Sequence, residues 1–200
     1  MSIRFVDELD GVLGWIEDAL LARTSHALAV DGRVWVIDPI EGNGVDERIR
    51  ALGEPAGVIQ LLDRHNRASA DFAERLGVPL HVVPESVDGS PFTFVPVLRR
   101  RLWSEVALWW PERRILVAAD ALGTIPHYFR VGGEPVGIHP LLRLLPPRSL
   151  RGLEPEHVLV GHGEAAHGVG SQLDEILAAS RRRIPRWLAG LPKLRRGARA

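Results

Sequence analysis

The stretch of sequence that decides the fold is IQLLDRHNRASADF, residues 59–72. It begins with a largely apolar run, which is typical of a strand buried on both faces of a sheet. Asp63 and His65 follow that run, and residues 68–76 then have the spacing of a short helix. The pattern places both side chains at the C-terminal end of a strand, where the backbone of α/β proteins is rigid and open to ligands.

The rest of the chain alternates predicted strands with a few predicted helices. The clearest signal is a β-hairpin in which residues 27–30 and 34–37 flank Asp31-Gly32. The other predicted strands are 58–62, 82–83, 93–97, 106–110, 115–119 and 158–160, and the predicted helices are 46–52, 68–76, 141–145, 172–179 and 184–191. Hairpins mixed with strand–helix units predict an α/β fold in which two sheets pack face to face with helices outside.

Composition limits the class of protein. The 200 residues fit one domain, predicted to span 1–192, and the basic run 193–200 predicts a flexible tail. Lys plus Arg and Asp plus Glu both number 25, so no net charge favours nucleic acid or an anionic membrane. No uncharged apolar run is long enough to predict a membrane span. The absence of cysteine excludes disulfides and thiolate metal sites and agrees with a cytoplasmic location.

Two further polar side chains follow apolar strands in the second half of the chain. Asp120 comes after the predicted strand 115–119, and His162 comes after 158–160. Together with Asp63 and His65 they would supply the nitrogen and oxygen donors that a zinc ion prefers, provided that all four converge. Each residue also has a simpler explanation, because a strand-end aspartate often caps loop amides and a histidine there is often a hydrogen-bonded structural residue.

Four segments, in this order along the chain, resemble those of metallo-β-lactamase-fold hydrolases. Residues 24–30 and 36–39 resemble the opening hairpin of that family, and 59–72 resembles its metal-binding turn. The segment LVAADAL, residues 116–122, resembles the strand end whose aspartate bridges two metals. The segment VLVGHG, residues 158–163, resembles the one whose histidine binds the second metal. The resemblance implies a four-layer αββα sandwich of the metallo-β-lactamase type.

The metal-binding turn departs from the family pattern. The family reads His-x-His-x-Asp-His, and the matching positions here are Asp63, His65, Arg67 and Ala68. A further family histidine falls near Arg101. The resemblance therefore implies that most ligands of a two-metal site are absent.

The resemblance leaves a reduced ligand set, which consists of His65, Asp120 and His162 with Asp63 as a possible oxygen donor. It also implies that Asp38 supports the metal-binding loop. The long segment after Asp120 borders the mouth of the site in this fold, so His127 and His139 are candidate mouth residues, although each is more simply a surface or packing histidine.

Arg67 and Arg101 are predicted to act as cations that replace metal ions. A guanidinium is always charged and forks onto carboxylates, so it can neutralise a buried aspartate without a metal. On this hypothesis Arg67 pairs with Asp120, and one arginine of residues 99–101 pairs with Asp63. The alternative is that both arginines point to solvent and that one metal sits on the four candidate ligands.

Two functions follow from these alternatives, and a structural role as a subunit of an assembly is a third option. The first is a divergent, non-catalytic member of the fold with no metal, which binds a small molecule or a protein in the old cleft. The second is a hydrolase that uses one divalent metal, zinc or iron, on Asp63, His65, Asp120 and His162. The sequence predicts neither a nucleic-acid partner nor a membrane partner, and it leaves the oligomeric state open.

Overall fold

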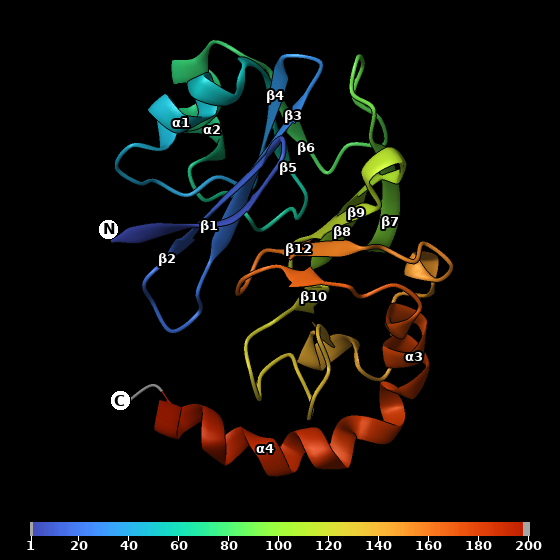
Figure 1. The fold of residues 1–200 in the computed structure, drawn as a ribbon. Coiled ribbons are helices and arrows are strands. Elements are labelled where there is room, and N and C mark those ends of the chain that lie inside the picture. The colour runs from blue at the N-terminus through green and yellow to red at the C-terminus, as the bar shows by residue number, and fades with distance from the viewer. Residues whose placement is uncertain (1, 198–200) are drawn as a thin grey trace.

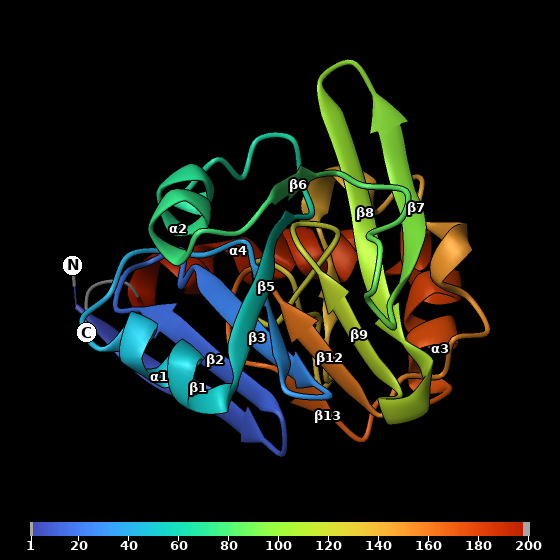
Figure 2. The same cartoon turned by 90° about the horizontal axis from the view of Figure 1, so that it is seen from above.

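The fold is described from a computed structural model that covers residues 2–197. Two β-sheets lie face to face, and helices α1 (Val45–Leu52) and α2 (Ser69–Leu76) cover the outer side of the first sheet (Figures 1 and 2). Helix α3 (Gln172–Ala179) packs on the side of the second sheet, and α4 (Ile184–Gly197) continues from it beneath the loops (Figure 1). The predicted α/β class and the four-layer αββα sandwich are both confirmed.

The first sheet is formed by the N-terminal half of the chain. Its strands, in spatial order, are β1 (Ile3–Leu9), β2 (Val12–Glu17), β3 (Thr24–Val30), β4 (Arg33–Ile37), β5 (Glu54–Gln60) and β6 (Leu80–Val82). The predicted hairpin joins β3 and β4, and its turn residues Asp31 and Gly32 both have positive φ, at 49° and 76°. Two consecutive positive φ angles make the type I′ turn that matches the twist of paired strands. The hairpin predicted from Asp-Gly is therefore confirmed.

The sequence did not predict the first hairpin, β1–β2. Strand β1 is an edge strand with a mostly exposed or half-buried pattern, and Asp7 and Glu8 interrupt its apolar residues. Edge strands commonly carry charges that protect them from pairing with another chain. The charged residues of this edge strand therefore break the alternation of apolar and polar residues by which a strand is recognised in a sequence.

The second sheet is formed by the C-terminal half. Its strands, in spatial order, are β13 (Ala166–His167), β12 (His157–Val160), β9 (Ile115–Ala118), β8 (Trp103–Trp110) and β7 (Thr93–Arg100), while β10 (Leu122–Gly123) pairs separately with β11 (Gly137–Ile138). Strands β9 and β12 run parallel, and their apolar residues are buried. Parallel strands covered on both faces need such continuous apolar runs, so these two were readable from the sequence.

The two sheets are tied together at one end of the sandwich. The apolar side chains between them form the larger core cluster, to which Trp35 and Leu62 of the first half and Trp110 of the second half belong. Isolated bridges link Leu62 to Glu105 and Arg23 to His162. Backbone pairing across the two sheets fixes the loops that follow β5 and β12 against one another.

One prediction near the C-terminal half needs correction, and the predicted tail can be compared only in part. The segment predicted as a helix over 141–145 is only a single 3-10 turn, Pro140–Leu142. Residues 193–197 belong to α4, where the basic run predicted a flexible tail, and 198–200 lie outside the described residues. None of the helices within the described part of the chain is long and apolar enough to cross a bilayer.

Candidate metal site

The candidate site lies where the C-terminal ends of two parallel strand pairs meet. In the first sheet, Asp38 follows β4 and His65 lies in the turn after the neighbouring strand β5. In the second sheet, Asp120 follows β9 and His162 follows the neighbouring strand β12. Each sheet therefore supplies one carboxylate and one imidazole from adjacent strand ends, on a backbone that the sheet holds in place.

Three of these side chains converge on a single oxygen atom. Asp120 Oδ1 lies 3.0 Å from His65 Nε2 and 3.1 Å from His162 Nε2. One potential ligand atom from each of the three residues lies within 4.8 Å of the others. The two imidazole rings are 6.0 Å apart between centroids.

The far nitrogen of each imidazole is held by a hydrogen-bond acceptor. His65 Nδ1 lies 3.1 Å from Asp38 Oδ2, and His162 Nδ1 lies 2.7 Å from the carbonyl oxygen of Leu21. Asp38 is itself oriented, because its Oδ1 accepts from the Leu61 N–H at 3.0 Å. A carboxylate and a carbonyl only accept, so each Nδ1 carries a proton and donates it, and in the neutral imidazole Nε2 then has a free lone pair.

The electrostatics of the group favour a cation at its centre. Burial opposes charge on His65, but the Asp38 and Asp120 carboxylates outweigh burial and raise the pKa of this imidazole. Burial also opposes charge on Asp120, yet hydrogen bonds from His162 and His65 and their positive charge hold its pKa well below the usual range. Each Nε2 atom lies about 3 Å from the same carboxylate oxygen, which requires a positive species between them, either protons or a metal ion.

The donor set of His65, Asp120 and His162 fits a divalent metal. Two imidazole nitrogens and one carboxylate oxygen suit zinc or ferrous iron, and three protein ligands leave a position open. The Asp38–His65 contact is the outer support that metal-bound histidines usually have, since it fixes the tautomer and the ring orientation. The residues present therefore match the chemistry of a single metal site.

Arg67 does not pair with a carboxylate as predicted. Its guanidinium donates to three backbone carbonyls, those of Thr24 at 2.7 Å, Asp38 at 2.9 Å and Gly161 at 3.1 Å. Burial lowers the pKa of Arg67, while the charges of Asp38 and Asp120 partly oppose that shift. The side chain fastens the start of β3 to the residues that follow β4 and β12, so it braces the site rather than standing in for a metal.

Arg101 is also placed differently from the prediction. It lies exposed in the turn between β7 and β8, at the tip of a hairpin that projects from the sheet (Figure 2). Of its two arginine neighbours, Arg99 pairs with Glu85 at 2.7 Å. Within residues 2–197, none of Arg99, Arg100 and Arg101 forms an ion pair with Asp63, so the predicted pairing of Asp63 with an arginine is not formed.

Asp63 stands apart from the other three candidate ligands. Its Oδ2 accepts from the Ser104 N–H at 3.0 Å, and its own N–H donates to the Ser104 carbonyl at 3.0 Å. The group of potential ligands among the described residues contains His65, Asp120 and His162 but not Asp63. Asp63 therefore caps the edge of β8, which is the simpler explanation that a strand-end aspartate always had.

His127 and His139, the two candidate residues at the mouth of the site, lie in different surroundings. His139 packs edge-on against Trp103 at 4.8 Å and Phe129 at 5.7 Å, and Phe129 in turn stacks on His162 at 6.0 Å. Burial lowers the pKa of His139 to about 4, so this imidazole is neutral at pH 7. His127 instead lines a pocket beside α4.

Sequence patterns missed two charged residues beside the site. Arg64 lies over the Trp103 ring at 4.6 Å, and its guanidinium is 3.8 Å from Asp120 Oδ2. Glu105 is fully buried and accepts from Trp103 Nε1 at 2.8 Å and from the Ala121 N–H at 2.9 Å. Burial raises the pKa of Glu105 to about 7, although those two hydrogen bonds oppose the shift. The one available signal for Glu105 was an acidic residue inside an otherwise apolar strand.

This chain resembles known proteins in its fold but not in its sequence. In sequence, the chain matches no family model and none of the curated proteins. In structure, it resembles the DIM-1 metallo-β-lactamase with a TM-score of 0.63 and 11% identity, over 92% of this chain and 98% of that one.

Two further structures have the same arrangement. The metallo-β-lactamase FIM-1 from Pseudomonas aeruginosa, in its mono-zinc form, matches with a TM-score of 0.57 and 10% identity over 96% of this chain and 98% of its own. A protein described as a diflavin flavoprotein from Nostoc sp. PCC 7120 matches with a TM-score of 0.58 and 14% identity over 92% and 96%. The chain therefore has the metallo-β-lactamase fold, with very little of those sequences.

Proposed function

We propose that this metallo-β-lactamase-fold chain is a divergent member that holds one divalent metal on His65, Asp120 and His162 and acts as a metal-dependent hydrolase. The observation that carries the proposal is the convergence of two imidazole Nε2 atoms on Asp120 Oδ1, at 3.0 and 3.1 Å, with both Nδ1 atoms engaged elsewhere. This is the tautomer that metal binding needs, already fixed by the protein.

The occurrence of a mono-zinc form of FIM-1 supports a one-metal reading of this fold. The sequence offers only part of a two-metal set, because the positions that match two family ligands are Arg67 and Ala68. Arg67 is committed to three carbonyls, so it supplies no donor to a second metal. We therefore propose one metal ion, zinc or iron, rather than two.

The residues around the site have distinct tasks in such a reaction. When bound, the metal would act as a Lewis acid that lowers the pKa of a water and polarises a substrate oxygen. Asp38 and the Leu21 carbonyl orient the two imidazoles. Arg64 lies at the exposed side, close to Asp120, where its guanidinium can bind an anionic or carbonyl group of a substrate.

His139 is a candidate hydrogen-bond donor to a substrate. Its Nδ1 accepts from the Leu141 N–H at 3.3 Å, so in the neutral ring the proton is at Nε2. Because the pKa of His139 is lowered to about 4, this imidazole holds that proton without taking up a second one at pH 7. It can orient a substrate, and its low pKa makes it a poor general base.

A second candidate function is binding without catalysis. The Asp38–His65–Asp120–His162 chain is also a complete hydrogen-bond network when both imidazoles are protonated, since each then donates twice. In that case the cleft would bind a small molecule or a protein and no metal. A cytoplasmic location is proposed with either function, on the absence of cysteine alone.

The test is zinc and iron stoichiometry after gel filtration of protein purified without added metal or chelator. The proposal predicts close to one metal per chain, with loss of metal in the His65→Ala and His162→Ala variants. The matched control is His167→Ala, because His167 forms an exposed pair with His157, Nδ1 to Nδ1 at 2.8 Å, that could bind metal adventitiously. His167→Ala should leave the tightly bound metal in place.

A parent protein that binds no zinc or iron even after incubation with either metal would reject the metal-dependent function and favour the second candidate. If the metal persists in His162→Ala and disappears in His167→Ala, the metal sits at the sheet edge and the proposal is wrong. Hydrolysis is then tested on ester and lactam panels, with Asp120→Asn as the inactive reference.

A further inference from the structure

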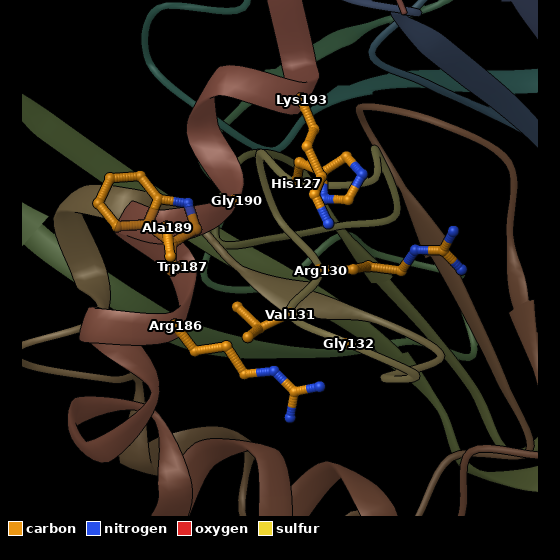
Figure 3. A pocket seen from close by; sticks show the side chains of 9 residues that line it. All are labelled: His127, Arg130, Val131, Gly132, Arg186, Trp187, Ala189, Gly190 and Lys193. Atoms are coloured by element: carbon orange, nitrogen blue, oxygen red, sulfur yellow. The ribbon is translucent and has the colours of Figure 1, made fainter.

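The segment 124–136 borders a second pocket, whose charged side chains differ from those of the candidate metal site. It has a volume of about 220 Å³ and lies between that segment and α4 (Figure 3). His127, Arg130 and Val131 line it from the segment, and Arg186, Trp187 and Lys193 line it from the helix. It shares no residue with the candidate metal site.

The charges around this pocket have one sign. Arg130, Arg186 and Lys193 are cationic, and the lining contains no aspartate or glutamate. Within the described part of the chain, none of these three side chains has an ion pair or a side-chain hydrogen bond, and Arg130 Nε is buried without a partner. A buried donor without an acceptor is costly, so an acceptor from outside would be favoured here.

Neighbouring arginines show that the fold could have paired these cations. On the same side of the molecule, Arg183 pairs with the buried Glu134, and Arg181 donates to the Leu144 carbonyl. Glu134 also accepts from the Val131 N–H, so its two oxygens are both used. Arg186, three residues beyond Arg183, forms no ion pair with any of the residues that the structure describes.

The pocket is shaped by fixed contacts as well as by charge. Trp187 Nε1 donates to the Tyr128 carbonyl at 2.9 Å, which fastens α4 to the segment. Gly132, at φ +70°, leaves room for the guanidinium of Arg186, because a Cβ there would lie 3.1 Å from its Nη2 atom. Figure 3 shows Arg186 and Lys193 reaching from α4 on two sides of Val131 and His127.

We propose that this pocket binds a phosphate-like dianion, free or as the phosphoryl group of a small molecule. Guanidinium and ammonium groups are the usual partners of phosphate, and three cations without acids favour a dianion over a monoanion. The volume of about 220 Å³ admits one phosphoryl group with room beside it, and the indole of Trp187 offers an apolar wall for a group that carries the phosphate. The site is independent of the proposed metal-dependent function.

The test is calorimetric titration of the full chain with inorganic phosphate at pH 7.5, in chelator and at constant ionic strength. Chelator removes any metal at the candidate metal site, which could otherwise bind phosphate itself. Saturable binding of one phosphate per chain is expected, with acetate much weaker. Arg186→Gln should weaken phosphate binding at least tenfold, and Lys193→Gln severalfold. Both side chains are exposed, so neither change should affect folding.

Two controls identify the site. Arg50→Gln removes an exposed arginine of α1, on the far layer of the sandwich, and should leave phosphate affinity unchanged. His162→Ala should also leave it unchanged. The proposal is overturned if the parent shows no saturable phosphate binding, if Arg186→Gln binds as well as the parent, or if His162→Ala abolishes binding.

Discussion

The candidate metal site and the pocket beside α4 both gather charged side chains, and they are built in opposite ways. At the metal site, each imidazole lies between two acceptors, and Arg67 satisfies three carbonyls. At the pocket, Arg130, Arg186 and Lys193 belong to a lining that contains no acid.

This difference separates two kinds of charged site. Where the chain supplies both signs, the charges hold the loops together, so a substitution removes stability as well as any ligand. Where the chain supplies one sign, the charges contribute little to folding, and a substitution should affect only the ligand. Four predictions follow this contrast from the largest expected effect to the smallest.

The largest effect is expected for Arg67→Ala. The substitution removes three charge-assisted hydrogen bonds to the carbonyls of Thr24, Asp38 and Gly161, so the free energy of unfolding should fall by roughly 3–5 kcal/mol. Denaturant unfolding of the metal-free protein measures it. Arg64→Ala is the matched control from the same turn, because Arg64 is half exposed, and it should cost about 1 kcal/mol or less. Equal losses for the two variants would contradict the bracing role of Arg67.

Glu105 gives the next largest effect, which depends on pH. Its pKa is about 7 in the folded chain against an ordinary 4.5, so the folded state keeps the proton longer than the unfolded state. The contribution of Glu105 to stability should therefore fall by roughly 3 kcal/mol as pH rises from about 4.5 to about 7, so the parent should lose that much relative to Glu105→Gln. Glu105→Gln cannot ionise and should lack this fall.

The measurement for Glu105 is the free energy of unfolding of both proteins, without metal, at several pH values between 4.5 and 8. The exposed Glu47 on α1 provides the control, since Glu47→Gln should follow the pH dependence of the parent. Parallel curves for the parent and Glu105→Gln would mean that Glu105 is ionised throughout the range, and the proposed burial effect would be absent.

A smaller effect is expected at Asp38, which contacts the metal site through His65. Asp38→Asn weakens the acceptor for His65 Nδ1, so zinc affinity should fall about 10- to 100-fold, which is roughly 1.4–2.7 kcal/mol. Competition with a chelating dye measures the affinity. Asp71→Asn, on the exposed side of α2, should leave zinc affinity unchanged. An unchanged affinity in Asp38→Asn would mean that His65 is not a ligand.

The smallest effect is expected at the cationic pocket. In chloride buffer, Arg186→Gln should change the free energy of unfolding by no more than about 0.5 kcal/mol, because Arg186 is exposed and has no ion pair among the described residues. Thermal and denaturant unfolding both measure it. A loss well above 1 kcal/mol would show that Arg186 supports the fold, and the contrast between the two regions would then fail.

The sequence was sufficient for most of the fold. Buried parallel strands such as β9 and β12 have continuous apolar runs, and the β3–β4 turn requires residues that tolerate positive φ, so both left clear patterns. The edge hairpin β1–β2 left none, because its exposed side chains are free to vary.

The sequence also placed the three potential ligands in the right loops. Asp120, His65 and His162 each follow a strand, and strand ends in neighbouring parallel pairs are forced to the same edge of a sheet. Residue spacing and sheet geometry together are enough to bring such side chains near one another. The expectation that residues 67 and 68 supply no ligand to a second metal came from the resemblance to metallo-β-lactamase-fold hydrolases, not from spacing.

Only the tertiary structure decided what each charge contacts. The sequence predicted that Arg67 would neutralise an aspartate, but its two terminal nitrogens donate instead to three carbonyls far away in the sequence or in other loops. Asp63, two residues from His65, turns to the Ser104 N–H, while Arg64 approaches Asp120 instead. A long side chain can reach several partners, and which one it binds depends on the packing of strands far apart in sequence. The order of residues determines the fold, and the way in which separate loops pack together determines which charged groups pair.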